Sequence, residues 1–447
     1  MYKVLLIEEN KMYSCYTGST SKNSEAVMEQ SIYSSIISII ELVCGALFIY
    51  QFVYIVIALF KKSPKFKAKK QYRYAVMISA KNEENVIGNL IKSILDQDYP
   101  KELFKVFVVA DNCDDNTAQV SRDAGAIVYE RTNTKHKGKG YALRFLIQQI
   151  HRDFNLKSFD GYMVFDADNL LDKSYITEIN KVFSNGYKIC TSYRNSKNYG
   201  SNWVTASSGI WFLREARHLN HARMALGVSC MVSGTGYVMH RDIVVRNNGW
   251  KFFLLTEDVE FSVDSILKGE TIGYCEDAVF YDEQPTSFVD SFNQRLRWAK
   301  GFYQVLHKDF KGLFKGLFSK RFMTCFDSLV ILGPGYIFLG GCASVAILTA
   351  LDNGGDVASF TTAIITIVLP LLLTSYILFA AMGFLVLITE YKKIYCKPSR
   401  AFLLLLTFPI FMFTYIPIAV IALFAKVKWT PIRHTFSYNN EEMQSQR

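Results

Sequence analysis

Two pairs of carboxylates in the middle of the chain have the spacing that metal binding and proton transfer require. Asp166 and Asp168 are separated by one residue and directly follow an apolar run that predicts a buried strand. Carboxylates spaced in this way can hold a hard divalent cation, with nucleotide phosphates filling its other positions. Glu257 and Asp258 open a helical pattern, where an acid either caps the helix or acts as a general base toward a sugar hydroxyl.

A third group of reactive side chains lies on one predicted helix, at residues 287–305. Gln294, Arg297 and Trp298 are spaced i, i+3, i+4 and therefore share a face of that helix. Arginine can hold a pyrophosphate with two parallel hydrogen bonds, and an indole offers a flat apolar face for a sugar ring. The same pattern is typical of an interfacial membrane helix anchored by Trp and Arg, and the two roles are compatible.

Alternating strand and helix patterns between residues 71 and 303 indicate the framework that positions these groups. Strands are predicted at 74–79, 105–110 and 161–165, and helices at 84–95, 117–124, 138–152 and 174–183. This alternation predicts a parallel sheet covered on both faces. A polar cluster follows each predicted strand, at residues 81–84, 111–115 and 166–168. Because ligands bind at the carboxyl ends of such strands, we expect the three clusters to converge on one site.

Several other classes of site are disfavoured. No G-x-G-x-x-G follows the first predicted strand and no G-x-x-x-x-G-K-[ST] occurs, which argues against dinucleotide and P-loop sites. The nine cysteines include no C-x-x-C pair, and the histidines show no spacing typical of metal ligands. The cysteines are therefore expected to be free thiols in a reducing compartment.

The composition leans toward a membrane protein. The chain has 447 residues, of which 50% are hydrophobic and 20% charged, with a formal net charge of +10. A water-soluble domain usually has about 25% charged residues. The composition disfavours a disordered protein, a collagen-like protein and a small disulfide scaffold.

The first part of the chain predicts one membrane crossing. Residues 31–60 are apolar and long enough to span a bilayer, and a polar tail at 1–30 precedes them. A run of lysines and arginines without acids follows at 61–73, which marks the cytoplasmic side. We therefore expect residues 1–30 to lie outside the cytoplasm. The neighbouring span explains the basic run, so a nucleic-acid partner is not expected.

Apolar segments return after the predicted α/β domain, which covers residues 61–305. Residues 326–425 predict three spans, or four if the long stretch at 360–391 crosses twice, and a tail follows at 426–447. Residues 306–325 and 203–226 mix aromatic with basic residues and predict amphipathic helices at the membrane interface. For the stretch at 203–226, an ordinary core helix is the alternative.

The order of the motifs resembles that of a known family. Asp111, Asp166-Ala-Asp168, Thr256-Glu-Asp258 and Gln294-x-x-Arg297-Trp298 occur in sequence within one α/β domain flanked by predicted spans. The region from about residue 71 to 308 resembles the processive, membrane-embedded family 2 glycosyltransferases, such as cellulose, mixed-linkage glucan, hyaluronan, chitin-oligosaccharide and capsular glucan synthases. The resemblance implies an α/β nucleotide-sugar domain of the GT-A type. Its sheet would be mostly parallel, and it would be inserted between transmembrane helices with amphipathic interface helices.

The resemblance also implies roles for individual residues. Nucleotide-sugar binding is expected for Asn82, Glu83, Asp111, Lys139, Asp166 and Arg297. Asp166 and Asp168 would hold the diphosphate through Mg²⁺ or Mn²⁺, and Asp258 would take the proton from the acceptor. Acceptor binding is expected for Gly234, Thr235, Glu257, Gln294 and Trp298. Residues 232–236 read V-S-G-T-G where cellulose synthases carry Cys-Gly-Ser or Cys-Gly-Thr, which leaves the acceptor and the linkage open.

The activity implied is that of an inverting, processive synthase in the plasma membrane. It would polymerise a β-glucan from UDP-glucose and export it. Its partners would be the UDP-sugar, the growing polysaccharide and membrane lipid. Accessory secretion subunits could also take part. The enzymatic alternatives are a hyaluronan- or poly-N-acetylglucosamine-type synthase and a non-processive transferase that moves one sugar to a lipid. The non-enzymatic alternative is a transporter with a nucleotide-sugar-sensing domain.

Overall fold

The computed structural model describes residues 49–333 and 355–428, together with residues 35, 39, 42, 430, 434, 436, 438 and 440–445. The chain divides into two compact units, Met1–Tyr50 with Gly335–Ile377, and Gln51–Pro334 with Leu378–Arg447. Every candidate site residue belongs to the second unit.

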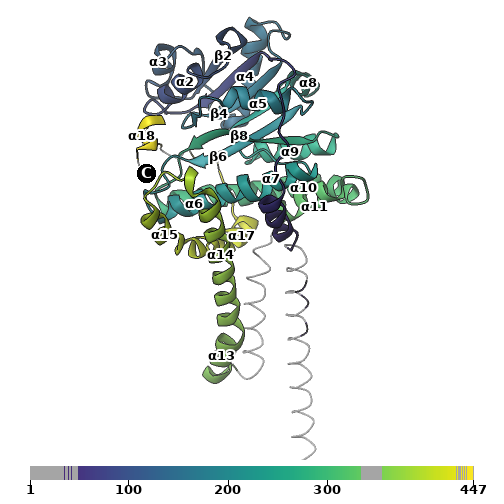
Figure 1. Cartoon of the computed structure of the whole chain (residues 1–447), viewed down its shortest axis with the longest axis vertical. Helices are drawn as coiled ribbons and strands as arrows, with labels where there is room; N and C mark the ends of the chain where they lie inside the picture. Colours follow the sequence, from purple (N-terminus) through teal and green to yellow (C-terminus); the bar gives the residue numbers. More distant parts are fainter. Residues whose placement is uncertain are drawn as a thin grey trace, which may run out of the picture. The chain divides into compact units, whose positions relative to one another are not determined.

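A mixed sheet forms the framework of the second unit (Figure 1). Its strands, in spatial order, are β3 (Ile127–Arg131), β2 (Phe104–Asp111), β1 (Tyr74–Ala80), β4 (Gly161–Asp166), β7 (Tyr237–His240), β6 (Ile189–Ser196), β8 (Ile272–Asp282) and β5 (Leu170–Leu171). The first four are mutually parallel, but β7 runs antiparallel to both β4 and β6. β8 is parallel to β6, and β5 is antiparallel to β8. The expectation of a mostly parallel sheet therefore holds for one half only, because β7 reverses the direction in the middle.

Three strands of the parallel half, β1, β2 and β4, form where the sequence predicts strands, whereas β3 was not predicted. β1, β2 and β4 are nearly continuous apolar runs that are buried along almost their whole length, as expected for strands covered on both faces. The helices that accompany them are α2 (Ile87–Leu95), α3 (Thr117–Asp123), α4 (Lys139–Asp153) and α5 (Tyr175–Phe183). In α2, the apolar positions recur at helical spacing and are buried against the sheet.

The stretch at 203–226 is a core element of this unit and not an interfacial helix. It folds as α6 (Trp203–Arg214), a π-helical segment η2 (Glu215–Asn220) and α7 (His221–Leu226). Asn202 and Thr205 form a capping box at its start. Ten of the twelve residues of α6 are buried, because the helix packs against β6 and against α15 (Pro398–Leu405) and α16 (Phe408–Phe413).

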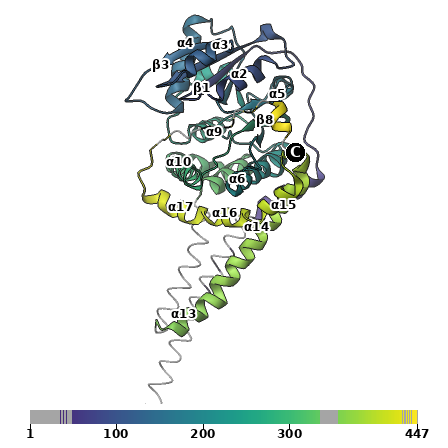
Figure 2. The ribbon, with the colours of Figure 1, turned by 90° about the vertical axis from the view of Figure 1, so that its left-hand side faces the viewer.

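A single long helix carries the Q-x-x-R-W motif and the second amphipathic stretch. α10 (Phe288–Gly316) runs through residue 305, so the predicted domain boundary falls inside a helix. Figures 1 and 2 show α10 and α6 on the side of the sheet that faces α15, α16 and α17 (Tyr415–Phe424). Phe310 and Phe314 are 48% exposed and Phe318, just beyond the helix, 81%.

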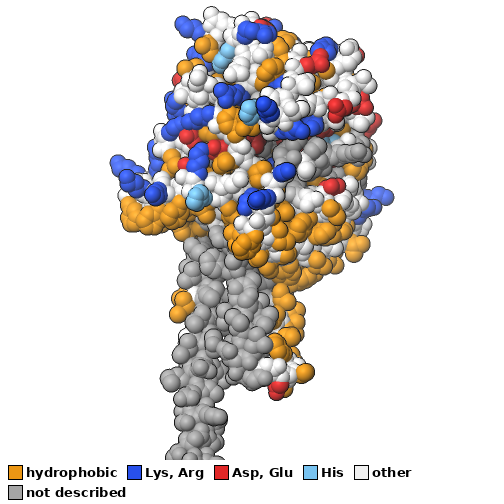
Figure 3. Space-filling model, turned by 180° about the vertical axis from the view of Figure 1, so that it is seen from behind, with side chains coloured by type: hydrophobic (Ala, Val, Ile, Leu, Met, Phe, Trp, Pro, Cys, Tyr) orange, Lys and Arg blue, Asp and Glu red, His pale blue; other side chains and the backbone are white. Residues whose placement is uncertain are grey.

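Exposed apolar side chains gather along one edge of this unit. In Figure 3 they form a band at its lower edge, with Lys and Arg side chains above. Eight of the exposed apolar side chains lie in or next to α10, α15 and α17. They are Phe310, Phe314, Phe318, Phe322, Phe402, Leu403, Leu406 and Phe424. An apolar face rimmed by basic residues is typical of contact with a lipid surface.

Membrane-spanning capacity is limited in the part of the chain that the structure describes. By length and composition, Val357–Lys393 is the one described helix that could cross a bilayer. The helices Pro398–Leu405 and Phe408–Phe424, bent by 40° to each other, qualify together as a second. Of the predicted span at 31–60, the structure describes residues 35, 39, 42 and the helix Ile49–Phe60, and of the first predicted span after residue 326 it describes only the end that lies in the helix Phe322–Leu332 and Gly333. Three or four C-terminal spans stay a prediction.

Close packing between α10 and the start of α9 (Glu257–Leu267) gives a first prediction. A Cβ on Gly301 would lie 2.5 Å from Oγ1 of Thr256. On an exposed helix, a Gly→Ala substitution usually raises the free energy of unfolding by about 1 kcal/mol. At Gly301 we expect the opposite, a decrease of about 1–3 kcal/mol, because the added methyl group would overpack the contact between the two helices. Denaturant unfolding in detergent, followed by circular dichroism, measures this change.

The matched control is Gly88→Ala in α2. A Cβ there would make ordinary contact with Val120 at 3.5 Å, so this variant should be neutral or slightly more stable. A Gly301→Ala protein as stable as the wild type would contradict the close approach of the two helices.

Candidate active site

The three polar clusters predicted at strand ends do lie along one edge of the sheet. Asp111 is the last residue of β2 and Asp166 the last of β4, while Glu83 follows β1. β1 lies between the other two strands and is in register with both, pairing Ser79 with Val109 and with Asp166. The carboxyl ends of all three strands therefore face the same space.

Lys139 is the cation that joins the D-x-D motif to the loop at residues 233–236. Its Nζ donates a hydrogen bond to Oδ1 of Asp166 and another, of 2.8 Å, to the carbonyl oxygen of Gly234. Burial alone would lower the pKa of Lys139, but the carboxylates of Asp166 and Glu257 outweigh it and the pKa is raised. Lys139 is therefore a permanent positive charge at the centre of the site.

The loop at 233–236 needs its glycines. Gly234 and Gly236 have φ values of 78° and 65°, and a Cβ on Gly236 would lie 2.2 Å from the ring of Phe280. Between them, Thr235 accepts a 2.9 Å hydrogen bond from the backbone N–H of Asp166. The loop is thus fixed to the D-x-D motif on one side while its backbone approaches the site closely on the other.

Glu257 and Asp258 are half-buried at the N-terminus of α9. Burial raises the pKa of Glu257 to about 7, and the charge of Asp258 adds to this effect, while Lys139 and Arg297 oppose it. Burial also raises the pKa of Asp258, against the stabilising effects of Lys139 and of the backbone N–H of Gly234. Two adjacent carboxylates whose pKa values are raised by burial have the properties that proton transfer requires.

Asp168 belongs to a second charged cluster on the same edge. Its carboxylate is buried and accepts a 2.8 Å hydrogen bond from the backbone N–H of Glu283. Burial works against ionisation, but the positive charges of His434 and Lys197 prevail, so the pKa of Asp168 is lowered. Asp168 is therefore ionised at neutral pH.

His434 is a site residue that the sequence did not reveal. Its Nδ1 lies 3.0 Å from both carboxylate oxygens of Glu83. Burial would lower the pKa of His434, but Asp168 and Glu83 raise it to about 10. Conversely, burial raises the pKa of Glu83 and the hydrogen bond from His434 opposes the increase. The pair is thus an ion pair in the neutral range.

Other residues near the C-terminus are anchored at the same edge. The backbone N–H of Phe436 donates to Glu283 and its carbonyl accepts from Lys197, both at 3.1 Å. Met443 is fully buried against Leu170 and Tyr281. No spacing in the sequence indicates these contacts, because each joins segments far apart in the chain.

Arg194 was also missed by sequence reasoning. It forms an ion pair with Asp282, donates a 3.1 Å hydrogen bond to the carbonyl oxygen of Ser233, and stacks on Phe212 at 3.6 Å. Burial raises the pKa of Asp282 to about 6 in spite of Arg194. Asp282 ends β8, so the strand-end rule would have identified it had that strand been recognised.

The two residues expected near the nucleoside are held by local contacts. Asp111 forms a buried ion pair with Arg131; burial raises the pKa of Asp111, and Arg131 counteracts this. Asn82 has a φ of 58°, a conformation that asparagine tolerates. Its Oδ1 accepts a 2.8 Å hydrogen bond from the backbone N–H of Asp114, joining the loops after β1 and β2.

The Q-x-x-R-W motif directs two of its three side chains toward the site. Arg297 donates a 3.0 Å hydrogen bond to the carbonyl oxygen of Leu255, just before α9, and its charge acts on Glu257. Trp298 meets Phe212 edge-on with ring centroids 6.0 Å apart. Gln294 is half-buried on the same helix. The neighbouring Arg295 is buried and bonds to Thr414 between α16 and α17, so it fixes α10 in place.

The acidic residues fit a divalent cation only in part. Among the described residues, no group of three or more His, Cys, Asp or Glu side chains could hold a metal ion alone. Asp166 and the ionised Asp168 nevertheless offer hard oxygen donors, and Mg²⁺ is often bound by one or two carboxylates together with substrate phosphates. The donor set therefore fits an ion that arrives with a diphosphate.

Comparison with protein families and known proteins identifies the chemistry. Residues 71–301, more than half of the chain, match the family described as "Glycosyltransferase like family 2". The chain is 25% identical over 293 residues to the probable glycosyltransferase YdaM of Bacillus subtilis, covering 61% of this chain and 64% of that protein.

Two further relatives have named products. A beta-monoglucosyldiacylglycerol synthase of Synechocystis is 26% identical, with 51% of this chain and 47% of the relative covered. A poly-beta-1,6-N-acetyl-D-glucosamine synthase of Staphylococcus aureus is 22% identical, with 62% and 66% covered. The chain thus spans between about half and two thirds of the length of these relatives.

A solved structure supports the fold. A mannosyltransferase from Pyrobaculum calidifontis, in complex with GDP-Man and Mn²⁺, superposes with a TM-score of 0.53 at 16% identity, covering 88% of this chain and 99% of the other. The GT-A-like fold expected from the sequence is therefore confirmed, with a mixed sheet.

The coupling between Glu257 and Asp258 predicts a change in pH dependence. In Asp258→Asn, a negative charge that raises the pKa of Glu257 is removed, so the Glu257 carboxyl should ionise at lower pH than in the wild type. Infrared difference spectra of the carboxyl C=O stretch, recorded as a function of pH, measure this ionisation in the purified protein. An unchanged or higher titration midpoint would contradict the coupling.

The raised pKa of His434 predicts that its contribution to stability depends on pH. A folded pKa of about 10, against about 6.5 in the unfolded chain, gives stabilisation that is complete below pH 6.5 and lost as pH rises through 10. We expect His434→Gln to lower Tm at pH 7.5 and to have a much smaller effect at pH 10.5.

The control for this experiment is His136→Gln, in the exposed loop before α4. This substitution should leave Tm unchanged at both pH values. Equal losses of Tm in His434→Gln at pH 7.5 and pH 10.5 would contradict the ion pair with Glu83.

Proposed function

Because the chain belongs to glycosyltransferase family 2, whose members transfer sugars, we propose that it transfers a hexose from a UDP-sugar to an acceptor hydroxyl with inversion of configuration. The observation that carries this proposal is the half-buried Glu257–Asp258 pair, whose pKa values burial raises and the charge of Lys139 opposes. The 233–236 loop contacts both sets of acids, because Thr235 accepts from the backbone N–H of Asp166 and the backbone N–H of Gly234 donates to Asp258.

The reaction is a single displacement. The acceptor oxygen forms a bond to the anomeric carbon while the bond from that carbon to the diphosphate oxygen breaks. Asp258 takes the acceptor proton, and UDP leaves with the bonding electrons. Attack opposite the leaving group converts an α-linked donor into a β-linked product.

Charge on the leaving diphosphate is balanced by groups on the edge of the sheet. Asp166 and Asp168 would hold Mg²⁺ or Mn²⁺, an ion that neutralises developing charge on the leaving group when bound. Lys139 and Arg297 add fixed positive charge next to the carboxylates, where it needs no reorganisation during the reaction.

A growing β-glucan made from UDP-glucose is the acceptor that the sequence motifs favour. Trp298 and Phe212 provide an aromatic wall beside the site, which suits a sugar ring. The similarity to a poly-N-acetylglucosamine synthase supports polymer formation, with UDP-N-acetylglucosamine as the alternative donor. Processive extension and export of the product are also part of this proposal. Export would require a channel formed by several membrane spans.

A glycerolipid acceptor is the second candidate. It is supported by the similarity to beta-monoglucosyldiacylglycerol synthases and by the exposed apolar band, which fits a bilayer surface next to the catalytic unit. Both versions place the enzyme in the plasma membrane with its catalytic unit in the cytoplasm.

The assignment of the base predicts a selective loss of activity. We expect Asp258→Asn to reduce transfer by about 100- to 10,000-fold and to leave UDP binding unchanged, because the carboxylate acts on the acceptor. Asp264→Asn is the matched control, since Asp264 lies on the same helix α9 in half-exposed ion pairs with Lys251 and Lys268. Wild-type turnover in Asp258→Asn would refute the assignment.

The acceptor is identified by sizing the product. Purified protein in nanodiscs, with Mg²⁺ or Mn²⁺, is offered labelled UDP-sugars singly and in pairs, with or without diacylglycerol. A long product from UDP-glucose alone that β-glucanases digest supports the synthase. A glucolipid of one sugar supports the second candidate, and absence of UDP release with every donor contradicts the proposed function.

A further inference from the structure

The chain contacts the catalytic unit both before α15 and after α17. Before α15, the carbonyl oxygen of Lys393 accepts a 2.8 Å hydrogen bond from Asn195 of β6. After α17, His434 contacts Glu83 at the edge of the same sheet. A segment whose two ends bind the same unit crosses a bilayer an even number of times. The described residues between these contacts contain one candidate span, formed by α15, α16 and α17 together, so the even number is zero.

α15, α16 and α17 are held against the base of this unit at both ends. Figure 2 shows the three helices in a row below α6 and α10. Near their start, Arg400 donates a 3.0 Å hydrogen bond to the carbonyl oxygen of Ser201. Near their end, Lys300 of α10 donates one of 3.2 Å to the carbonyl oxygen of Leu423. A span would carry one end across about 30 Å of hydrocarbon, away from the unit that both ends contact.

The face of these helices that is not packed on the unit is apolar. Its exposed side chains, between 40% and 82% accessible, are Phe402, Leu403, Leu406, Ile410, Val420, Ile421, Leu423 and Phe424. The buried face consists of Ala401, Leu405, Phe408, Phe411, Met412, Ile418 and Ala422. A helical segment with one face fixed to protein and the other face apolar suits the plane of a membrane interface, where such a face is buried by about 5–10 Å.

Basic residues without acids flank this apolar face. Residues 391–440 contain no Asp or Glu. Their lysines and arginines are Lys392, Lys393, Lys397, Arg400, Lys426, Lys428 and Arg433. Lys426 and Lys428 are exposed and form no ion pair within the part of the chain that the structure describes. This charge attracts anionic lipid head groups, whereas a second copy of the chain would bring two positive surfaces together.

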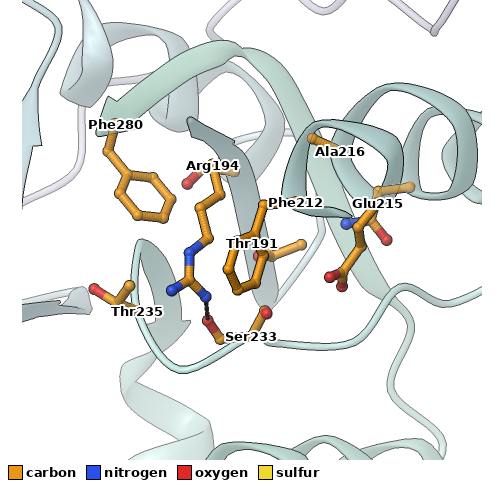
Figure 4. Close-up of a pocket in the computed structure, with 10 residues that line it drawn as sticks. Thr191, Arg194, Phe212, Glu215, Ala216, Ser233, Thr235 and Phe280 are labelled. Atoms are coloured by element: carbon orange, nitrogen blue, oxygen red, sulfur yellow. Dashed lines mark hydrogen bonds between the residues drawn. The ribbon is translucent and has the colours of Figure 1, made fainter. Parts of the chain in front are cut away.

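α6 lies between these helices and the active site. Figure 4 shows Phe212 of α6 beside Arg194, on which it stacks at 3.6 Å. The preceding residue, Trp211, stacks on Tyr415 of α17 with ring centroids 5.7 Å apart. A lipid surface in contact with α17 would therefore lie one layer of helices away from Arg194 and the loop at 233–236.

We infer that α15, α16 and α17 do not cross the membrane but lie in the leaflet next to the catalytic unit and bind anionic phospholipid there. The exposed apolar side chains enter the acyl region, and Lys426 and Lys428 contact the head groups. Residues 425–428 then stay on the side of the catalytic unit, as the tendency of basic residues to remain in the cytoplasm requires. The inference replaces the last predicted C-terminal crossing, adds the class of lipid and does not depend on the proposed function.

Depth measurements distinguish a flat segment from a span. A fluorescent amino acid is encoded singly at Leu403, Ile410 or Phe424, which are 65%, 52% and 82% exposed, in the full chain in nanodiscs. Quenching by lipids brominated near the head group is compared with quenching by lipids brominated near the end of the acyl chain. We expect the shallow bromine to quench more strongly at all three positions. The same label at Leu156, a 44% exposed residue beyond α4, should not be quenched by either lipid.

Two outcomes would overturn the flat placement. Quenching at Ile410 that is strongest with the deep bromine, together with shallow quenching at Leu403 and Phe424, would show a membrane span. Absence of quenching by both lipids at all three positions would show that protein covers this face.

The class of lipid is tested with the label at Phe424. Brominated phosphatidylglycerol and brominated phosphatidylcholine are compared as equal minor components in phosphatidylcholine. We expect quenching that corresponds to an enrichment of phosphatidylglycerol by about 5- to 30-fold, and loss of most of this enrichment in the double variant Lys426→Gln with Lys428→Gln. The control is Lys92→Gln with Lys105→Gln, exposed residues of α2 and β2, which should keep it.

Equal quenching by the two lipids in the wild type, or full enrichment in the double variant at residues 426 and 428, would contradict the binding of anionic lipid. None of these readings requires turnover. A protein that transfers no sugar would therefore refute the proposed function and leave this inference intact.

Discussion

The concentration of buried carboxylates along one edge of the sheet is the constraint on which the rest of this structure depends. Ionised groups removed from water are costly unless each is paired. Four of the acids here form an ion pair with a cation from another segment: Asp166 with Lys139, Asp282 with Arg194, Asp111 with Arg131 and Glu83 with His434. These pairs join the parallel strands, the antiparallel strands and the C-terminal residues into one charged surface.

The reversal of strand direction at β7 explains how two sets of acids meet there. The parallel half brings Asp111 and Asp166 to the edge by the ordinary rule for such sheets. The loop before β7 then crosses beside β4 and supplies Gly234, which contacts Lys139 and Asp258. The loop therefore links the D-x-D motif to the acids at the start of α9.

The sequence predicted the features that depend on local patterns. β1, β2 and β4, the helices between them and the acids at their ends follow from apolar runs and polar clusters. The strands beyond β4 were not recognised, because β5 and β7 have only two and four residues, and polar residues interrupt the apolar pattern of β6 and β8. The amphipathic stretch at 203–226 became buried because α15 and α16, almost two hundred residues later, cover it. His434 and Arg194 act through contacts between distant segments, which no residue spacing encodes.

The central claim is that one edge of the sheet holds the donor while Asp258 activates a hydroxyl on the opposite face of the sugar. The configuration of the first bond formed tests this most directly. Proton NMR of the product from an α-linked UDP-sugar, recorded during the first turnovers, reports the anomeric configuration. The account predicts a β-linked product from the first detectable signal. An α-linked product would contradict single displacement and with it the role of Asp258.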